Sequence, residues 1–111
     1  MSNTIEEITS EKSSGNVFED LGFPDAKERF VKVQLAFKIA TLIQRRKLKQ
    51  IDAAKMLGIN QAKISLLVNG KIDDFSIDRL MEFLTRLDQD VEIVVKRKPK
   101  SHHAGEIRVA I

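Results

Sequence analysis

The segment from residue 49 to 71 constrains the fold more than any other part of the chain, because it predicts two short helices joined by a tight turn. We expect the first helix over residues 50 to 57 and the second over residues 60 to 68. Gly58 lies between them, where a residue without a Cβ can adopt the left-handed conformation that ends a helix. Asn60 is suited to cap the second helix. The boundaries of the pair are thus predicted by residue type as well as by spacing.

The apolar residues of this segment recur at helical spacing, so they point into one shared core. They are Ala54, Leu57, Ile59, Ile64 and Leu67. The opposite side of the second helix carries small or polar side chains and no acid, namely Gln61, Ala62, Lys63, Ser65 and Asn69. A helix-turn-helix places such a face on base edges in the major groove of DNA. A helical hairpin with the same packing and no DNA partner is the alternative.

The basic charge of the chain is concentrated around this segment. The net charge is +3, but residues 31 to 71 alone hold nine basic residues and one acidic residue. The stretches on either side, residues 1 to 30 and 72 to 95, are both acidic overall. Such a basic region is typical of a surface that neutralises DNA phosphates, although a solvated basic face could look similar.

The composition limits the other classes of function. The 111 residues are 42% hydrophobic, which suits one modest core, and the absence of cysteine excludes disulfides and thiolate metal or redox sites. No apolar run approaches the roughly 18 residues of a membrane span or resembles a signal peptide, so we expect a cytoplasmic protein. His102 and His103 lack further ligands, and no nucleophile pattern or phosphate loop is present. We therefore expect no metal, no cofactor and no catalytic site.

Periodicity along the rest of the chain predicts its domain organisation. Residues 1 to 15 lack a periodic pattern and are typical of a flexible tail, and a capping box at residues 16 to 19 opens a helical domain that extends to residue 90. Within this domain, a long helix from residue 24 to 47 carries an apolar arc wide enough for a second contact, such as a second subunit. A further helix begins after Ser76. Its apolar positions are Ile77, Leu80, Met81, Leu84 and Leu87.

Residues 91 to 111 change to a period of two, which predicts a pair of β-strands. The alternating apolar positions are Val91, Ile93 and Val95 in one segment and Ile107, Val109 and Ile111 in the other. Since an isolated hairpin is only marginally stable in water, we expect the strands either to pair with those of a second copy or to dock on the helices. The predicted fold is mostly α-helical with a short C-terminal β extension. A dimer could form through this extension or through the long helix.

The pattern of the two short helices resembles the phage-repressor or Cro-like (XRE) helix-turn-helix family. The residues that carry the resemblance are Gln50, Ala54, Leu57-Gly58, Asn60, Ile64-Ser65 and Asn69-Gly70. The resemblance implies a λ-repressor-like helical domain that binds double-stranded operator DNA as a homodimer. The side chains expected at base edges are Gln61, Ala62, Lys63 and Leu66. Those expected at backbone phosphates are Arg45, Arg46, Lys49, Gln50, Ser65, Asn69 and Lys71.

A longer layout is similar to one branch of this family, the HigA-like antitoxins. It comprises SGNVFEDLGFPDA ahead of the helices, FSIDRLMEFLTRL after them, and DVEIVV followed by a basic run and EIRVAI. This resemblance implies a transcriptional repressor of its own operon that also binds and silences a RelE- or HigB-like toxin. Two alternatives remain open. One is a stand-alone XRE-family regulator without a toxin, and the other is a protein-interaction module that uses the acidic residues 1 to 30 and does not bind DNA.

Overall fold

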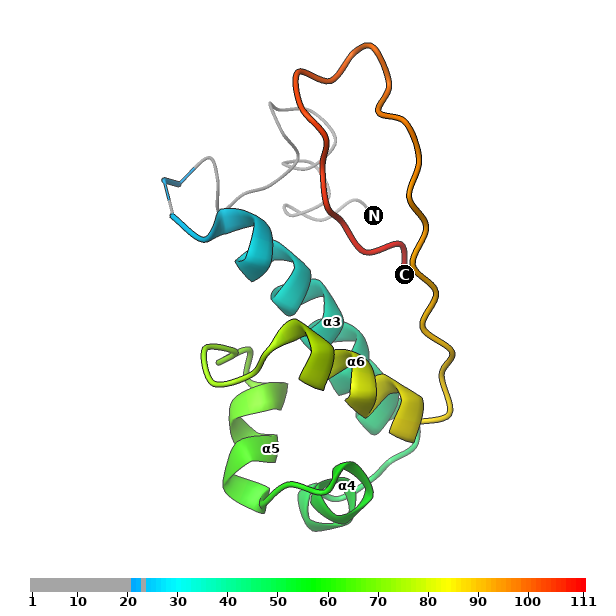
Figure 1. Cartoon of the computed structure of the whole chain (residues 1–111). Helices are drawn as coiled ribbons and strands as arrows, with labels where there is room; N and C mark the ends of the chain where they lie inside the picture. Colours follow the sequence, from blue (N-terminus) through cyan, green and yellow to red (C-terminus); the bar gives the residue numbers. More distant parts are fainter. Residues whose placement is uncertain (1–20, 23) are drawn as a thin grey trace, which may run out of the picture. The chain divides into compact units, whose positions relative to one another are not determined.

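The computed structural model describes residues 21–22 and 24–111, and these contain four α-helices (Figure 1). The helices are α3 (Ala26–Arg45), α4 (Gln50–Leu57), α5 (Gln61–Val68) and α6 (Ile77–Arg86). The chain falls into two compact units, one of residues 32–93 with Ile111 and the other of the residues up to Val31 together with 94–110. The predicted tail over residues 1–15 and the capping box at 16–19 lie outside the described residues.

The turn between α4 and α5 has the predicted geometry. Gly58 has a φ of 72°, in the left-handed region, and the N–H groups of Gly58 and Ile59 both donate to the carbonyl oxygen of Ala54. Asn60 caps α5, because its Oδ1 accepts from the backbone N–H of Lys63 at 2.8 Å. The helix-turn-helix prediction is therefore confirmed, with both helices beginning and ending within one residue of the expected positions.

All four described helices end in the same hydrogen-bonded motif. In each, a residue after the helix has a positive φ, and the N–H of the next residue reaches back to a carbonyl oxygen in the last turn. The four donor and acceptor pairs are Leu48 with Ile43, Ile59 with Ala54, Lys71 with Leu66 and Gln89 with Leu84. Glycine takes the positive-φ position after α4 and α5. After α3 and α6 this position is taken by Lys47 and Asp88, whose φ values are 55° and 62°.

The core of the 32–93 unit contains side chains from all four helices. Its fully buried members are Ile39, Leu57, Ile64, Leu67, Leu80, Phe83 and Leu87. On α6 the sequence predicted Ile77 and Met81 as core positions, but both are only half-buried. Phe83 takes that place instead, with its ring centroid 6.0 Å from that of Phe75 in an edge-to-face arrangement. α6 therefore buries a slightly different face than the sequence predicted. This helix also packs against α4.

The long first helix is shorter at both ends than predicted, since α3 covers Ala26–Arg45 and not residues 24 to 47. Its core face is well defined, because Ile39 is fully buried. Phe37 points the other way and is 70% exposed. The apolar arc is thus wider than the core requires, as the sequence indicated.

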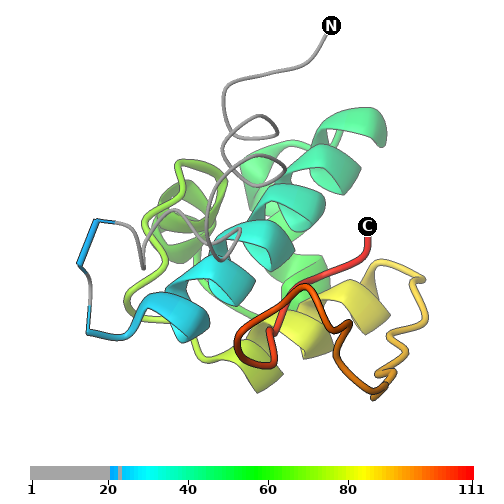
Figure 2. The ribbon, with the colours of Figure 1, turned by 90° about the horizontal axis from the view of Figure 1, so that it is seen from above.

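The predicted C-terminal pair of β-strands is wrong. In the described chain, residues 91–111 form neither helix nor strand, and Figures 1 and 2 both draw them as a coil without an arrow. A strand with one buried face would cover one of any two neighbouring side chains, yet Val94 and Val95 are 68% and 92% exposed. The N–H of His102 donates to the Pro99 carbonyl oxygen at 3.1 Å, which closes a local turn between the two apolar segments. Alternation fixes which side chains share a face, but a strand also needs a neighbour for its backbone groups.

Candidate nucleic-acid interface

The exposed face of α5 carries the side chains that the sequence assigned to base edges. Gln61, Ala62 and Lys63 form the first turn of the helix and are exposed, and Leu66 in the next turn is half-buried. Their buried counterparts, Ile64 and Leu67, are 0% and 1% exposed and hold the opposite side in the core. The structure thus brings the four predicted base-reading residues together on the outer side and at the N-terminal end of one helix.

Two predicted phosphate contacts on α5 are joined to each other. The Nδ2 atom of Asn69 donates to the backbone carbonyl oxygen of Ser65 at 2.8 Å and lies 3.5 Å from its Oγ. The same carbonyl oxygen also accepts from the backbone N–H of Asn69 at 3.2 Å, so Asn69 is bonded to the last turn of α5 through both its backbone and its side chain. The Oδ1 atom of Asn69 and the Ser65 hydroxyl stay available on the same side of the helix.

The N-terminus of α4 is the second place where predicted contacts gather. Lys49 occupies the cap position with an extended backbone, at φ −71° and ψ 155°, and its side chain makes no capping hydrogen bond. Gln50 follows as the first helical residue, and both side chains are exposed. A helix N-terminus carries a partial positive charge and unpaired N–H donors, so this end of α4 suits an anionic group such as a DNA phosphate.

Most of the predicted basic contacts are exposed, without an acidic partner among the described residues. Arg45, Lys49, Lys63 and Lys71 take part in no ion pair within the part of the chain that the structure describes. Three of these four lie next to an end of α3, α4 or α5, and Lys63 lies in the first turn of α5. Exposed cations without an acidic partner can meet phosphates without first breaking an ion pair.

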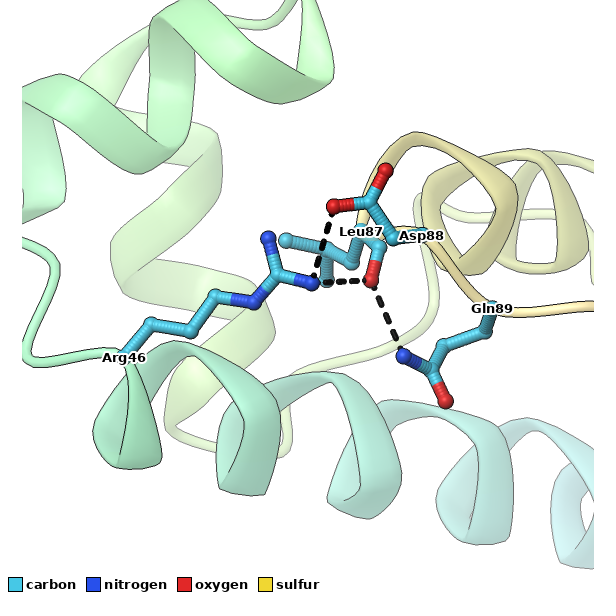
Figure 3. A network of polar contacts seen from close by, with 4 residues as sticks. All are labelled: Arg46, Leu87, Asp88 and Gln89. Atoms are coloured by element: carbon cyan, nitrogen blue, oxygen red, sulfur yellow. Dashed lines mark hydrogen bonds and ion pairs between the residues drawn. The ribbon is translucent and has the colours of Figure 1, made fainter.

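Arg46 differs from the other basic residues predicted at phosphates, because its guanidinium is engaged within the protein (Figure 3). Its Nη2 atom donates to the carbonyl oxygen of Leu87 at 2.5 Å and lies 3.2 Å from Oδ2 of Asp88. The Nε2 atom of Gln89 donates to the same carbonyl oxygen at 3.0 Å. No local sequence pattern signals this contact, because its partners lie 41 and 42 positions along the chain.

A second long-range contact that the sequence did not reveal involves Arg86 and the turn of the helix-turn-helix. A Cβ at Gly58 would lie 2.9 Å from Nη1 of Arg86, so the guanidinium lies directly over the backbone of the turn. Arg86 is also paired with Glu82 at 3.2 Å, and Glu82 lies 3.5 Å from Arg79. A side chain at Gly58 would therefore displace the guanidinium of Arg86, in addition to straining the left-handed backbone.

The described residues also bear on other kinds of site. Among them, no group of three or more His, Cys, Asp or Glu side chains lies together in a way that could hold a metal ion. His102 forms a pair with Glu106, at 3.7 Å between Nδ1 and Oε1. Across the same residues, no helix is both long enough and apolar enough to cross a membrane.

Comparison with known proteins places these features in a family. A family model described as a helix-turn-helix domain matches residues 17–96, which include all four helices. A solved structure named "Putative XRE Family Transcriptional Regulator" is 50% identical in sequence, with a TM-score of 0.75 over 79% of this chain and 99% of that chain. This chain belongs to the XRE helix-turn-helix family. The comparison with curated proteins gave no match.

Membership of the XRE family confirms the broader of the two resemblances seen in the sequence. It accounts for the order of α3 to α6 and for the capped turn between α4 and α5. The narrower resemblance, to HigA-like antitoxins, stays a prediction, as do the individual contacts assigned to DNA.

Proposed function

We propose that this XRE protein is a sequence-specific, DNA-binding transcriptional repressor. The observation that carries the proposal is the outer face of α5, where Gln61, Ala62, Lys63 and Leu66 project from a helix whose other side is fixed in the core. Within this family of folds the second helix of the pair enters the major groove, and its N-terminal residues meet the base edges. α5 presents its N-terminal turn as such a reading surface.

The chemistry of these side chains fits base recognition. Gln61 can form two hydrogen bonds with adenine, and Lys63 can donate to guanine O6 and N7. Ala62 and the exposed part of Leu66 offer apolar contact to thymine methyl groups. No acidic side chain lies in the first turn of α5 to repel the DNA.

The proposed anchors to the DNA backbone flank this surface. Gln50 and Lys49 at the start of α4 and Lys71 after α5 would meet phosphates, together with Arg45, Ser65 and Asn69. These contacts set the orientation of α5 in the groove and carry no base preference themselves. Each cation that neutralises a phosphate also releases a condensed counterion, which makes binding salt-dependent.

The proposal includes a two-fold dimer that binds an inverted repeat, since XRE-type helix-turn-helix domains read half-sites about one helical turn apart. It further includes control of the protein's own operon, in the cytoplasm, and an antitoxin role toward a RelE- or HigB-like toxin. The antitoxin role is supported by the likeness of the segments outside the helix-turn-helix to HigA-like proteins. Co-purification with the product of the neighbouring gene, together with relief of growth arrest caused by that product, would test it.

A salt titration tests the DNA-binding proposal directly. Binding is measured to the duplex just upstream of the protein's own gene and to a scrambled duplex of equal length and composition. If six to ten phosphates are neutralised, affinity should fall by about 10³ to 10⁵ between roughly 50 and 200 mM salt. The upstream duplex should still be preferred by at least about 10³ at physiological salt. Equal affinity for both duplexes at every salt concentration would overturn the proposal.

A further inference from the structure

The contact between Arg46 and the end of α6 joins two parts of the chain that lie on either side of α4. Arg46 directly follows α3 and precedes α4 by four residues, whereas Leu87 directly follows α6. α6 in turn packs against α4. The hydrogen bond from Nη2 of Arg46 to the Leu87 carbonyl oxygen therefore closes a ring that runs from the α3–α4 linker through α4 and α6 and back.

The chemistry of the contact suits a fixed attachment. The last carbonyl groups of a helix lack helical N–H partners and carry a partial negative charge. Arg46 supplies a cationic donor to this position, and Gln89 supplies a second, neutral donor to the same oxygen (Figure 3). The side chain of Arg46 is 30% exposed, although the residue as a whole counts as exposed, as do Arg45 and Lys47 on either side of it.

Asp88 adds to the attachment at some cost to the backbone. It holds the left-handed position after α6 at φ 62°, which glycine would occupy with less strain. Its carboxylate lies 3.2 Å from Nη2 of Arg46, so an aspartate at this position makes a contact that glycine could not make. The same guanidinium nitrogen thus faces two acceptors from the end of α6.

We propose that Arg46 is a positioning residue for operator binding. It fastens the α3–α4 linker to the end of α6 and thereby fixes the N-terminus of α4, where Lys49 and Gln50 meet a backbone phosphate. Arg46 does not itself contact DNA, contrary to the role that the sequence suggested for it. The inference rests on the proposed function, since it names the residue that holds one of the proposed phosphate contacts in place.

The salt dependence of operator binding separates a positioning residue from a phosphate contact. Arg46→Ala is compared with Arg45→Ala, a matched loss of one arginine at the neighbouring, exposed position. Both are measured at a low temperature at which circular dichroism shows full helicity. Arg46→Ala should weaken operator binding by about 2- to 30-fold without changing the slope of log affinity against log salt. Arg45→Ala should lower that slope by about 0.9 for each phosphate that it no longer neutralises. A lowered slope in Arg46→Ala would show a direct phosphate contact and overturn the inference.

A double-mutant cycle with Gln50→Ala separates positioning from a purely structural role. If Arg46 acts through the N-terminus of α4, Arg46→Ala should cost clearly less affinity when Gln50 has already been replaced. Ile39→Val serves as the control for stability, because it trims the core of α3 and should lower the melting temperature without weakening operator binding. Fully additive losses in the cycle, or wild-type affinity in Arg46→Ala, would overturn the inference.

Arg46→Lys provides a second test of the positioning role in case the alanine variant does not fold. Lysine keeps the charge, but its ammonium ends one bond short of the Nη2 position. We expect weaker operator binding at an unchanged salt slope, whereas a phosphate contact would tolerate the exchange and give wild-type affinity. Failure of the proposed function itself would be seen separately, as equal binding of the wild-type protein to operator and scrambled DNA.

Discussion

At the scale of single residues, Lys47 adopts the left-handed backbone conformation, which is usually adopted by glycine. Its φ of 55° ends α3, and a side chain with a Cβ in this region costs roughly 1 kcal/mol. We expect Lys47→Gly to raise the free energy of unfolding by about 0.5–1 kcal/mol, because relief of this strain outweighs the added entropy of the unfolded chain. Thermal or urea denaturation followed by circular dichroism would measure the change.

Lys47→Ala is the matched control for this prediction, since it removes the charge but keeps the Cβ. Its stability should equal that of the wild type. A gain as large as that of the glycine variant would show that repulsion among neighbouring cations, and not backbone strain, is being relieved.

Gln61 belongs to the same scale, because a single side chain is expected to read a single base pair. We expect Gln61→Ala to cost about 1–3 kcal/mol on the preferred operator and to relax the preference at one position of each half-site. Binding to a set of operators with single base changes would measure this. Lys71→Ala is the comparison, since removal of a phosphate contact should weaken binding to every sequence alike. The same uniform loss for Gln61→Ala would assign Gln61 to the DNA backbone.

At the scale of elements, the start of α6 is stabilised by a capping arrangement that depends on pH. The Ser76 hydroxyl and then the backbone N–H of Asp78 lower the pKa of the Asp78 carboxyl, burial acts in the opposite direction, and the N–H of Arg79 lowers it further. The Oγ of Ser76 also accepts from the Arg79 N–H at 3.2 Å. Since the pKa of Asp78 is lower in the folded chain, its carboxylate stabilises the fold at pH values above the ordinary pKa of 3.8. This contribution is lost as the pH falls through the lowered pKa.

Asp78→Asn should therefore reduce the acid sensitivity of the fold. We expect the stability of this variant to change less than that of the wild type between about pH 6 and about pH 3, as measured by urea denaturation at several pH values. Asp74→Asn, in the loop before α6, is the control and should follow the wild-type curve. An unchanged pH profile in Asp78→Asn would show that the Asp78 carboxylate does not contribute to the acid sensitivity of the fold.

The helices could be predicted from the sequence because their signals are local. Gly58, Asn60 and Ser76 each act on backbone groups within a few positions, and the apolar spacing of α4 and α5 selects one buried face. On α6 the prediction chose Met81 and missed Phe83, since both fit helical spacing and only the packing against Phe75 decides between them. The prediction of strands was wrong for the opposite reason. Strand pairing depends on a neighbouring strand, which the alternating pattern of residues 91–111 does not supply.

At the scale of the whole molecule, we expect a dimer. Sedimentation equilibrium at micromolar concentration should give twice the 12.6 kDa mass of one chain. Footprinting should show protection of two half-sites related by inversion and separated by about 10 base pairs or a multiple of that. Symmetry provides the reason, because two copies related by a two-fold axis can place two α5 helices in successive major grooves. A monomer that protects one unrepeated site would contradict this expectation.

The candidate site was predictable to the extent that it lies on one helix. The outer face of α5 follows from its cap and its buried side, both of which are visible in the sequence. The roles of Arg46 and Arg86 were not predictable, because each depends on a contact with a distant segment. A count of basic residues places Arg45 and Arg46 together in one phosphate-binding group, whereas the structure gives only Arg46 an acceptor at the end of α6.

The exposed coil that follows α6 also bears on how long each part of the protein survives in the presence of proteases. Proteases cut best where the chain is exposed and lacks regular structure, and residues 96–100 supply three lysines and an arginine within such a coil. We expect brief trypsin digestion to cut in this run before it cuts in α3 to α6, as mass spectrometry of the fragments would show. Earlier cuts within α4 or α5 would contradict this order. Cleavage in this run would separate the C-terminal segment from the unit of residues 32–93, so any task of that segment would end while α5 stays intact.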